Sequence, residues 1–279
     1  ELFILFLITL VTLLLRGYKY RITFMLPYSY QYLDPTLFTR DIAFFPYDLN
    51  FFFLMNAYLS KIVSYETLFF GGYLISSFLL ILGVYFLAKT IFDNQKIAMI
   101  AVLLVIFVKP AVSAMTTVWT YYYYKDVAMG LILISVAFFL RKRYMVSFSV
   151  LGVASLFHIL FSLYFVAFYG IYFVWNYFRL GNEQRKKILW GFVVLGLFLV
   201  GPIYLILSSE QPQSSPEEFE QWLGILKTRS FDHFFPSTWI TNSVILFFPL
   251  LVLFGVFLYY LWTKKDFVAH QFRQEITLV

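Results

Sequence analysis

Two carboxylates and one guanidinium fall close together in the first long polar segment of the chain. Asp34, Arg40 and Asp41 belong to the run Tyr32-Leu33-Asp34-Pro35-Thr36-Leu37-Phe38-Thr39-Arg40-Asp41. Because Pro35 disfavours the α conformation for the residue before it, the Asp34 carboxylate need not belong to a helix face. A carboxylate beside an apolar segment can act as a general base, with a pKa raised by its surroundings, or as a ligand for a hard divalent cation. The alternative is structural: Asp34 caps a short helix that starts at Pro35, and Asp41 pairs with Arg40 or caps another helix.

His158 lies inside an apolar stretch, Leu156-Phe157-His158-Ile159-Leu160. Polar residues within such stretches usually face a cavity or a partner. If the chain turns at this point, the imidazole lies near a membrane surface, where it can donate to a phosphate or bind a metal ion. The competing interpretation is a histidine whose hydrogen bonds are satisfied by a carbonyl of the turn itself.

His233 lies in Asp232-His233-Phe234-Phe235-Pro236, with Lys227 and Arg229 just before it. An acid, an imidazole and aromatic rings together suit a polar head group, either a sugar or a phosphate. The competing interpretation is an aromatic belt that anchors the next helix at the membrane surface.

The elements that must position these residues are long apolar segments. Hydrophobic residues make up 61% of the chain and charged residues 13%, and the mean hydropathy is +0.79. A soluble domain cannot hide that much apolar surface from water. The sequence therefore predicts an all-α, polytopic transmembrane helical bundle, with residues 1–279 forming one integral membrane domain that is a fragment of a longer protein.

Crossing a hydrocarbon core of about 30 Å takes about 20 apolar residues in a helix. The stretch from Tyr144 to Phe178 is too long for one simple crossing. We expect either two short helices that turn near His158 or one tilted helix with a protruding end. With two helices there, the chain has about eight crossings. The predicted spans are Leu2–Leu15, Leu68–Leu87, Ile97–Val108, Val127–Leu140, Val146–Trp175, Ile188–Leu207 and Ile240–Trp262.

The charges between the spans predict the orientation. Four gaps, Lys89–Lys96, Arg141–Arg143, Arg179–Lys187 and Lys264–Lys265, together hold eleven basic residues and, with Asp266 just beyond the last, three acids. Such an excess is typical of cytoplasmic loops, which explains the net charge of +6 without nucleic-acid binding. We expect contacts of these loops with anionic lipid. The prediction is a multi-pass integral membrane protein with these loops in the cytoplasm.

Two long segments, about 16–66 and 208–239, then lie on the outer side. The stretch Leu49–Val63 predicts a helix in the membrane interface, with Asn56 on a different side from its phenylalanines. A second amphipathic helix is predicted after Ser215, where a Ser-Pro-Glu-Glu start precedes apolar residues at helical spacing. The run Tyr121–Tyr124, followed by Lys125 and Asp126, is more typical of interfacial anchoring than of a site.

Several signatures are missing from the sequence. It has no cysteine, no glycine-rich phosphate loop, no nucleophile elbow and no His-Glu-x-x-His helix. Nor do acids recur in the middle of several spans, which counts against an ion-coupled pump.

The layout resembles the glycosyltransferase-C superfamily of polyprenyl-phosphate-sugar enzymes. More narrowly, Leu26-Pro27 followed by Tyr32-Leu33-Asp34-Pro35-Thr36-Leu37-Phe38 and Asp41 resembles a group of uncharacterised bacterial membrane proteins. Phe157-His158-Ile159-Leu160 and His233-Phe234-Phe235-Pro236 are similar to later landmarks of that group. The resemblance covers about Leu26 to Trp239.

The resemblance implies that Asp34 or Asp41 is the first-loop acid, which serves as base or metal partner while polyprenyl phosphate leaves the sugar. Arg40, His158 or His233 would then stabilise the departing phosphate. The segment Arg21-Ile22-Thr23-Phe24-Met25 departs from the pattern because it holds no acid.

The function that the resemblance implies is sugar transfer from a polyprenyl-phosphate donor at the extracytoplasmic face of a bacterial inner (plasma) membrane. The partners are membrane lipids and that donor, and the cofactor is left open, a divalent cation being one option. The alternative is a non-catalytic transport, flippase-like or envelope-assembly component.

Overall fold

The computed structural model describes residues 1–16, 29–30, 32–34, 36–37, 51–107, 122, 124–208, 220 and 224. The chain divides into two compact units. The first is formed by residues 1–103, 118–209 and 278–279, and the second by residues 104–117 and 210–277. The first unit holds nearly all of the described residues.

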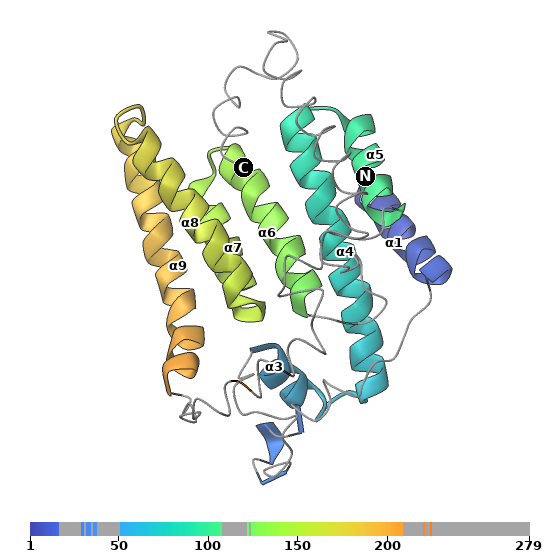
Figure 1. Ribbon diagram of the computed structural model, residues 1–279. Helices are drawn as coiled ribbons and strands as arrows, with labels where there is room; N and C mark the ends of the chain where they lie inside the picture. Colours follow the sequence, from blue (N-terminus) through green and yellow to red (C-terminus); the bar gives the residue numbers. More distant parts are fainter. Residues whose placement is uncertain are drawn as a thin grey trace. The chain divides into compact units, whose positions relative to one another are not determined.

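All regular secondary structure in the described part of the chain is helical, which confirms the predicted all-α fold (Figure 1). The chain order of the helices is α1 (Leu2–Arg16), α3 (Phe51–Leu59), α4 (Tyr65–Phe92), α5 (Gln95–Phe107), α6 (Tyr124–Leu140), α7 (Tyr144–Phe157), α8 (Ile159–Asn176) and α9 (Asn182–Ser208).

Three of these helices are long and apolar enough to cross a membrane: α4, α8, and residues Asn182–Tyr204 of α9. Large apolar side chains are exposed on the outer helices, among them Leu14 at 84%, Val174 at 74% and Leu197 at 72%. Contiguous apolar surface of this kind is unfavourable in water and favourable in lipid. The chain is a helical membrane protein.

The stretch from Tyr144 to Phe178 forms two helices, α7 and α8, with His158 between them. The pair is antiparallel, because Ser147 of α7 and Tyr169 of α8, equally far from His158 along the chain, are hydrogen-bonded to each other. The prediction of a turn near His158 is confirmed, and the prediction of one tilted helix is wrong.

Most of the basic residues that the structure describes lie at one end of the bundle. Helices α4 and α6 run in parallel toward it, since Gly72 faces Tyr122 and Gly83 faces Gly130. Helices α7 and α9 start there and run away from it (Figure 1). We call this the basic end; it holds the segments Lys89–Lys96, Arg141–Arg143 and Arg179–Lys187. We call the opposite end, where α3 lies, the α3 end.

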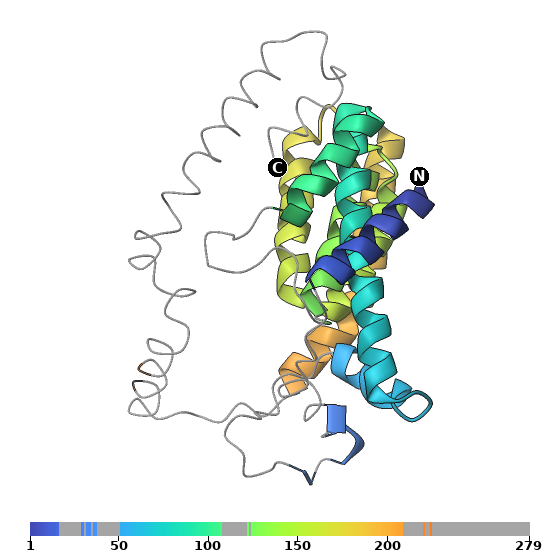
Figure 2. The same ribbon diagram turned by 90° about the vertical axis from the view of Figure 1, so that its right-hand side faces the viewer.

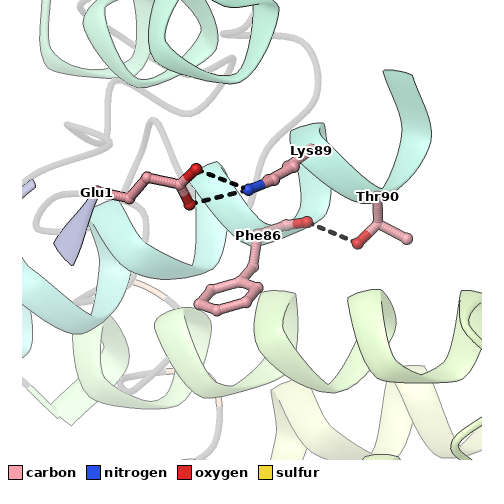
Figure 3. A network of polar contacts seen from close by, with 4 residues as sticks. All are labelled: Glu1, Phe86, Lys89 and Thr90. Carbon is pink, nitrogen blue, oxygen red and sulfur yellow. Dashed lines mark hydrogen bonds and ion pairs between the residues drawn. The ribbon is translucent and has the colours of Figure 1, made fainter. Parts of the chain in front are cut away.

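Helix α1 crosses the face of α4, as Figure 2 shows. The Glu1 carboxylate accepts two hydrogen bonds from Lys89 Nζ, at 3.0 and 2.8 Å, and these bonds lower the pKa of Glu1. Figure 3 shows this pair beside the Thr90 hydroxyl, which donates to the Phe86 carbonyl. Because both charged side chains are partly exposed, the pair contributes little stability and mainly fixes the start of α1 near the end of α4.

Helices α4 and α6 approach closely at two glycines. A Cβ atom on Gly130 would lie 2.6 Å from the carbonyl carbon of Leu79 and 2.7 Å from the amide nitrogen of Leu80. A Cβ atom on Gly83 would lie 2.6 Å from the Gly130 carbonyl oxygen. Within a membrane, small residues at a helix crossing let the backbones meet and gain van der Waals contact. This crossing fixes α4 against α6.

A buried hydrogen-bond network joins α6, α7 and α8. The Ser135 and Ser147 hydroxyls each bond to the other residue's carbonyl oxygen at 2.9 Å. The Tyr169 hydroxyl lies 2.9 Å from Ser135 Oγ, and its ring stacks on Phe139 with the centroids 4.0 Å apart. Polar groups that bond across apolar helices specify which faces meet.

Replacing Tyr169 by phenylalanine is expected to lower the free energy of unfolding by about 1 kcal/mol, because the stacked ring stays while the hydroxyl's bonds to the two serines are lost. Thermal unfolding of the purified protein in detergent measures the change. Tyr164→Phe is the matched control, since this α8 tyrosine is 59% exposed. Equal losses in the two variants would contradict a role for the network.

The predicted helix within Leu49–Val63 is confirmed as α3, but the predicted side of Asn56 is wrong. Asn56 is fully buried and shares its face with Phe52 and Phe53. Residues three and four apart lie on the same side of a helix, so the packing of these phenylalanines carries Asn56 inward. The predicted amphipathic helix after Ser215 and the predicted span Ile240–Trp262 lie outside the described residues, apart from Glu220 and Gly224.

Candidate functional site

Aromatic side chains hold α3 against the end of the bundle. Phe52 lies 4.7 Å from the Tyr122 ring and 5.7 Å from the Tyr124 ring, measured between centroids. Phe51 meets Phe157, the residue before His158, at 6.0 Å. The α3 end is therefore a packed layer of rings that surrounds the turn between α7 and α8.

His158 forms that turn and joins the two helices. Its backbone N–H donates to the Ala154 carbonyl at the end of α7, and its Nδ1 accepts from the Phe161 N–H at 3.4 Å at the start of α8. The imidazole is thus the N-cap of α8. An Nδ1 that accepts leaves the proton on Nε2, which has no hydrogen-bond partner within the described part of the chain.

Rings and a positive charge surround the imidazole. It stacks on Phe161 with the centroids 4.1 Å apart and lies 5.5 Å from the Tyr124 ring. The Lys125 ammonium lies 5.9 Å from the centroid of the same Phe161 ring. Burial and, secondly, the charge of Lys125 lower the pKa of His158 to about 4, so the ring is neutral at physiological pH. A neutral imidazole with its proton on Nε2 is a hydrogen-bond donor beside a cation.

The pH dependence of stability follows from this low pKa. Between pH 6.5, the ordinary pKa of histidine, and about pH 4, His158 binds a proton in the unfolded chain but not in the folded chain. The folded state therefore loses stability as the pH falls through this window. Because the ring is partly exposed, we expect a loss of only about 1 kcal/mol at pH 5. The variant His158→Asn can keep the cap but does not titrate. Its melting temperature should fall less than that of the wild type between pH 7 and pH 5; equal falls would contradict the assignment.

Lys125 and Asp126 belong to the first turn of α6, and the charge of Lys125 acts on His158. Asp126 is 4% exposed, whereas Lys125 is partly exposed. Sequence reasoning assigned both to interfacial anchoring and did not connect them with His158. The only signal was a charged pair that directly follows four tyrosines, and the contact itself depends on how α6 packs against α7 and α8.

Asn56 is a second residue that sequence reasoning missed. Its Oδ1 and Nδ2 atoms are both buried and have no hydrogen-bond partner within the described ranges. An unpaired buried amide costs about 1–3 kcal/mol. The α3 end therefore keeps a polar amide inside its aromatic layer, at a cost in stability.

Asp34 lies in an exposed turn. Its Oδ1 accepts from the Thr36 hydroxyl at 2.6 Å and from the Thr36 N–H at 3.0 Å. These two bonds lower the pKa of Asp34. A general base needs a pKa near the working pH, so this environment favours the role of cation ligand over that of base. The bonds also agree with the capping interpretation, with the cap on a turn at Thr36 and Leu37.

Of the five predicted site residues, the structure describes Asp34 and His158, and both belong to the α3 end. The Tyr30 ring lies 5.2 Å from the ring of Tyr65, at the start of α4. Tyr32 packs against the same aromatic cluster as Phe157. The remaining three, Arg40, Asp41 and His233, lie outside the described residues.

The described part of the α3 end holds no cluster of metal-ligating side chains. Among the described residues, no group of three or more His, Cys, Asp or Glu side chains is close enough to hold a metal ion. Asp34 Oδ1 is used by Thr36, which leaves Oδ2 as the oxygen that a cation would take. A cation site here would need Asp41 or another ligand as well.

Comparison with known proteins found no significant match to this chain. No protein-family model matches the chain, and neither a curated protein nor a solved structure is significantly similar to it.

Proposed function

We propose that the chain is a glycosyltransferase-C-like enzyme that transfers a sugar from a polyprenyl-phosphate donor at the extracytoplasmic face of a bacterial inner membrane. The observation that supports this most is that Asp34 and His158, far apart in the sequence, belong to the same end of the bundle. That end is opposite to the basic end, which the positive-inside rule assigns to the cytoplasm. The proposal includes about eight crossings for the chain.

The proposed roles follow from the chemistry of the α3 end. When the donor's glycosidic bond breaks, negative charge develops on the departing phosphate. His158 Nε2 is a neutral hydrogen-bond donor, and the Lys125 ammonium adds a positive charge. Because this ammonium is partly buried, its attraction for the phosphate is stronger than it would be in water. Arg40 and His233 are proposed as further phosphate contacts.

The acids take different roles in this scheme. Asp34 is ionised at neutral pH and suits a divalent cation, which would neutralise charge on the phosphate when bound. Asp41 is then the proposed base that removes the proton from the attacking acceptor hydroxyl. The carbon–oxygen bond to the phosphate breaks as the bond to the acceptor forms.

A transfer assay in proteoliposomes tests the proposal. Radiolabelled polyprenyl-phosphate sugar is incorporated into the bilayer with the purified protein, and the label is followed into an acceptor or into water. The expected result is loss of label from the lipid that depends on the protein. A donor lipid that stays intact with every sugar and acceptor tried would contradict enzymatic activity.

One observation favours a second candidate, a non-catalytic transport, flippase-like or envelope-assembly component. Asp34 and His158 each have a structural role, since one caps a turn and the other caps α8. A non-catalytic component would bind the lipid, and photo-crosslinking of a polyprenyl-phosphate sugar to Lys125 or His158 without turnover would support it. Turnover would exclude it.

A further inference from the structure

Basic side chains gather where α7 and α9 begin. The connection from α6 to α7 is Arg141-Lys142-Arg143, and all three residues are exposed. The first turns of α9 add Arg185, Lys186 and Lys187, and Glu183 is the one acid among the residues described there, 3.6 Å from Lys186. This concentration of charge is independent of the proposed transferase site, which lies at the α3 end.

The two helices bring their basic residues to the same level. A Cβ atom on Gly191 of α9 would meet the Phe148 ring of α7, and one on Gly152 of α7 would meet the Phe198 ring of α9. The helices are therefore parallel and closely packed. Arg143 precedes Phe148 by five residues and Lys187 precedes Gly191 by four, which places both about 6–8 Å above the contact. With axes about 8–10 Å apart, the two long side chains can reach one phosphate.

Not every basic residue is available for this. The Arg185 Nε–H donates to the Leu180 carbonyl at 2.9 Å, and the guanidinium lies 4.6 Å from the centroid of the Tyr177 ring. Arg185 thus holds the connection between α8 and α9. Arg143 is the N-cap of α7 but makes no side-chain capping bond, so its guanidinium is not required by the helix.

Apolar surface lies directly beneath these charges. Trp175 is 70% exposed and Phe178 91% exposed at the end of α8, and Trp190 is 62% exposed near the start of α9. Tryptophan at this depth is typical of the boundary between head groups and acyl chains. A soluble anion would use only the charges, whereas a lipid would use the charges and the apolar surface together.

We propose that an anionic phospholipid binds at the basic end, with its phosphate between Arg143 and Lys187 and its acyl chains along the exposed surface of α8 and α9. Helices α7 and α9 both begin at this end, and the start of a helix favours negative charge. The partner is a membrane lipid with a phosphate that carries net negative charge, as in phosphatidylglycerol or cardiolipin.

Native mass spectrometry of the full chain, released from nanodiscs, tests this. The nanodiscs contain phosphatidylcholine alone or mixed with phosphatidylglycerol or cardiolipin, and the bound lipid is counted. The wild type should retain the anionic lipids in preference to phosphatidylcholine. Arg143→Gln/Lys187→Gln should lower that affinity about 30-fold, from the attraction of an anionic surface for two basic residues.

Two further variants make the result specific. Lys96→Gln/Lys186→Gln removes the same charge from the same end, and it should retain anionic lipid within about twofold of the wild type, since Lys186 lies toward Glu183. Arg143→Lys/Lys187→Arg keeps both charges and should retain lipid even if the glutamine variant folds poorly. Equal lipid loss in the two glutamine variants, no preference for anionic lipid, or displacement of the lipid by inorganic phosphate would each overturn the proposal.

Discussion

Replacing Gly130 by alanine is expected to destabilise the protein by about 2–3 kcal/mol, although alanine is the better helix former. The intrinsic preference alone would stabilise α6 by about 1 kcal/mol. The added Cβ, however, would lie 2.6–2.7 Å from backbone atoms of Leu79 and Leu80 in α4. Backbone atoms of a membrane helix cannot move aside as a flexible side chain does, so the helices must separate and lose contact along the crossing.

The matched control is Gly71→Ala in α4, where a Cβ atom would meet nothing within 4 Å. We expect this variant to be as stable as the wild type or slightly more stable. The stability of both variants is measured by thermal unfolding in detergent, and the signal is the fraction of protein that stays monodisperse. Equal stability of Gly130→Ala and Gly71→Ala would contradict the close packing of α4 against α6 at Gly130.

Replacing Asp34 and Asp41 together by asparagine is expected to lower sugar transfer at least about 100-fold, the lower bound for the loss of a positioned acid or base. Asparagine keeps an oxygen that accepts from Thr36, so the turn at Asp34 should persist. The substitutions remove the negative charge of Asp34, which the proposed cation requires, and that of Asp41, which the proposed base requires. Transfer in proteoliposomes and the melting temperature are measured on the same samples.

Asp93→Asn is the control for charge and folding. Asp93 ends α4 at the basic end with φ at 47°, a left-handed conformation that asparagine also tolerates. This variant should transfer sugar at the wild-type rate. Wild-type transfer by the variant that lacks both Asp34 and Asp41 would refute the assignment of these acids while leaving the lipid proposal at the basic end unaffected.

Much of the secondary structure could be predicted from the sequence, for a simple physical reason. In lipid, every backbone N–H and C=O group needs an internal partner, so a long apolar stretch must be helical. The turn at His158 was also predictable, because the stretch around it exceeds the thickness of one bilayer. The segment Arg141–Arg143 marks a membrane surface for the complementary reason that exposed charges stay out of hydrocarbon.

The contacts of individual side chains were less predictable. Asn56 was expected on the polar side of α3, but the burial of Phe52 and Phe53 against Tyr122 and Tyr124 turned it inward. Lys125 was expected to be an anchor, and the packing of α6 beside α8 placed it next to the ring that stacks on His158. Local spacing could not reveal either contact, because each depends on a helix distant in the sequence.

By itself, the sequence determined that the chain is a bundle of membrane helices and where most of those helices begin and end, since hydrophobic length and loop charge act locally. Only the tertiary structure decided which helices meet and which polar groups share an end. Helices that are apolar on every side have no stripe that selects a partner. The selection comes from close packing at Gly83 and Gly130 and from the bonds among Ser135, Ser147 and Tyr169, and these form only when the helices are assembled.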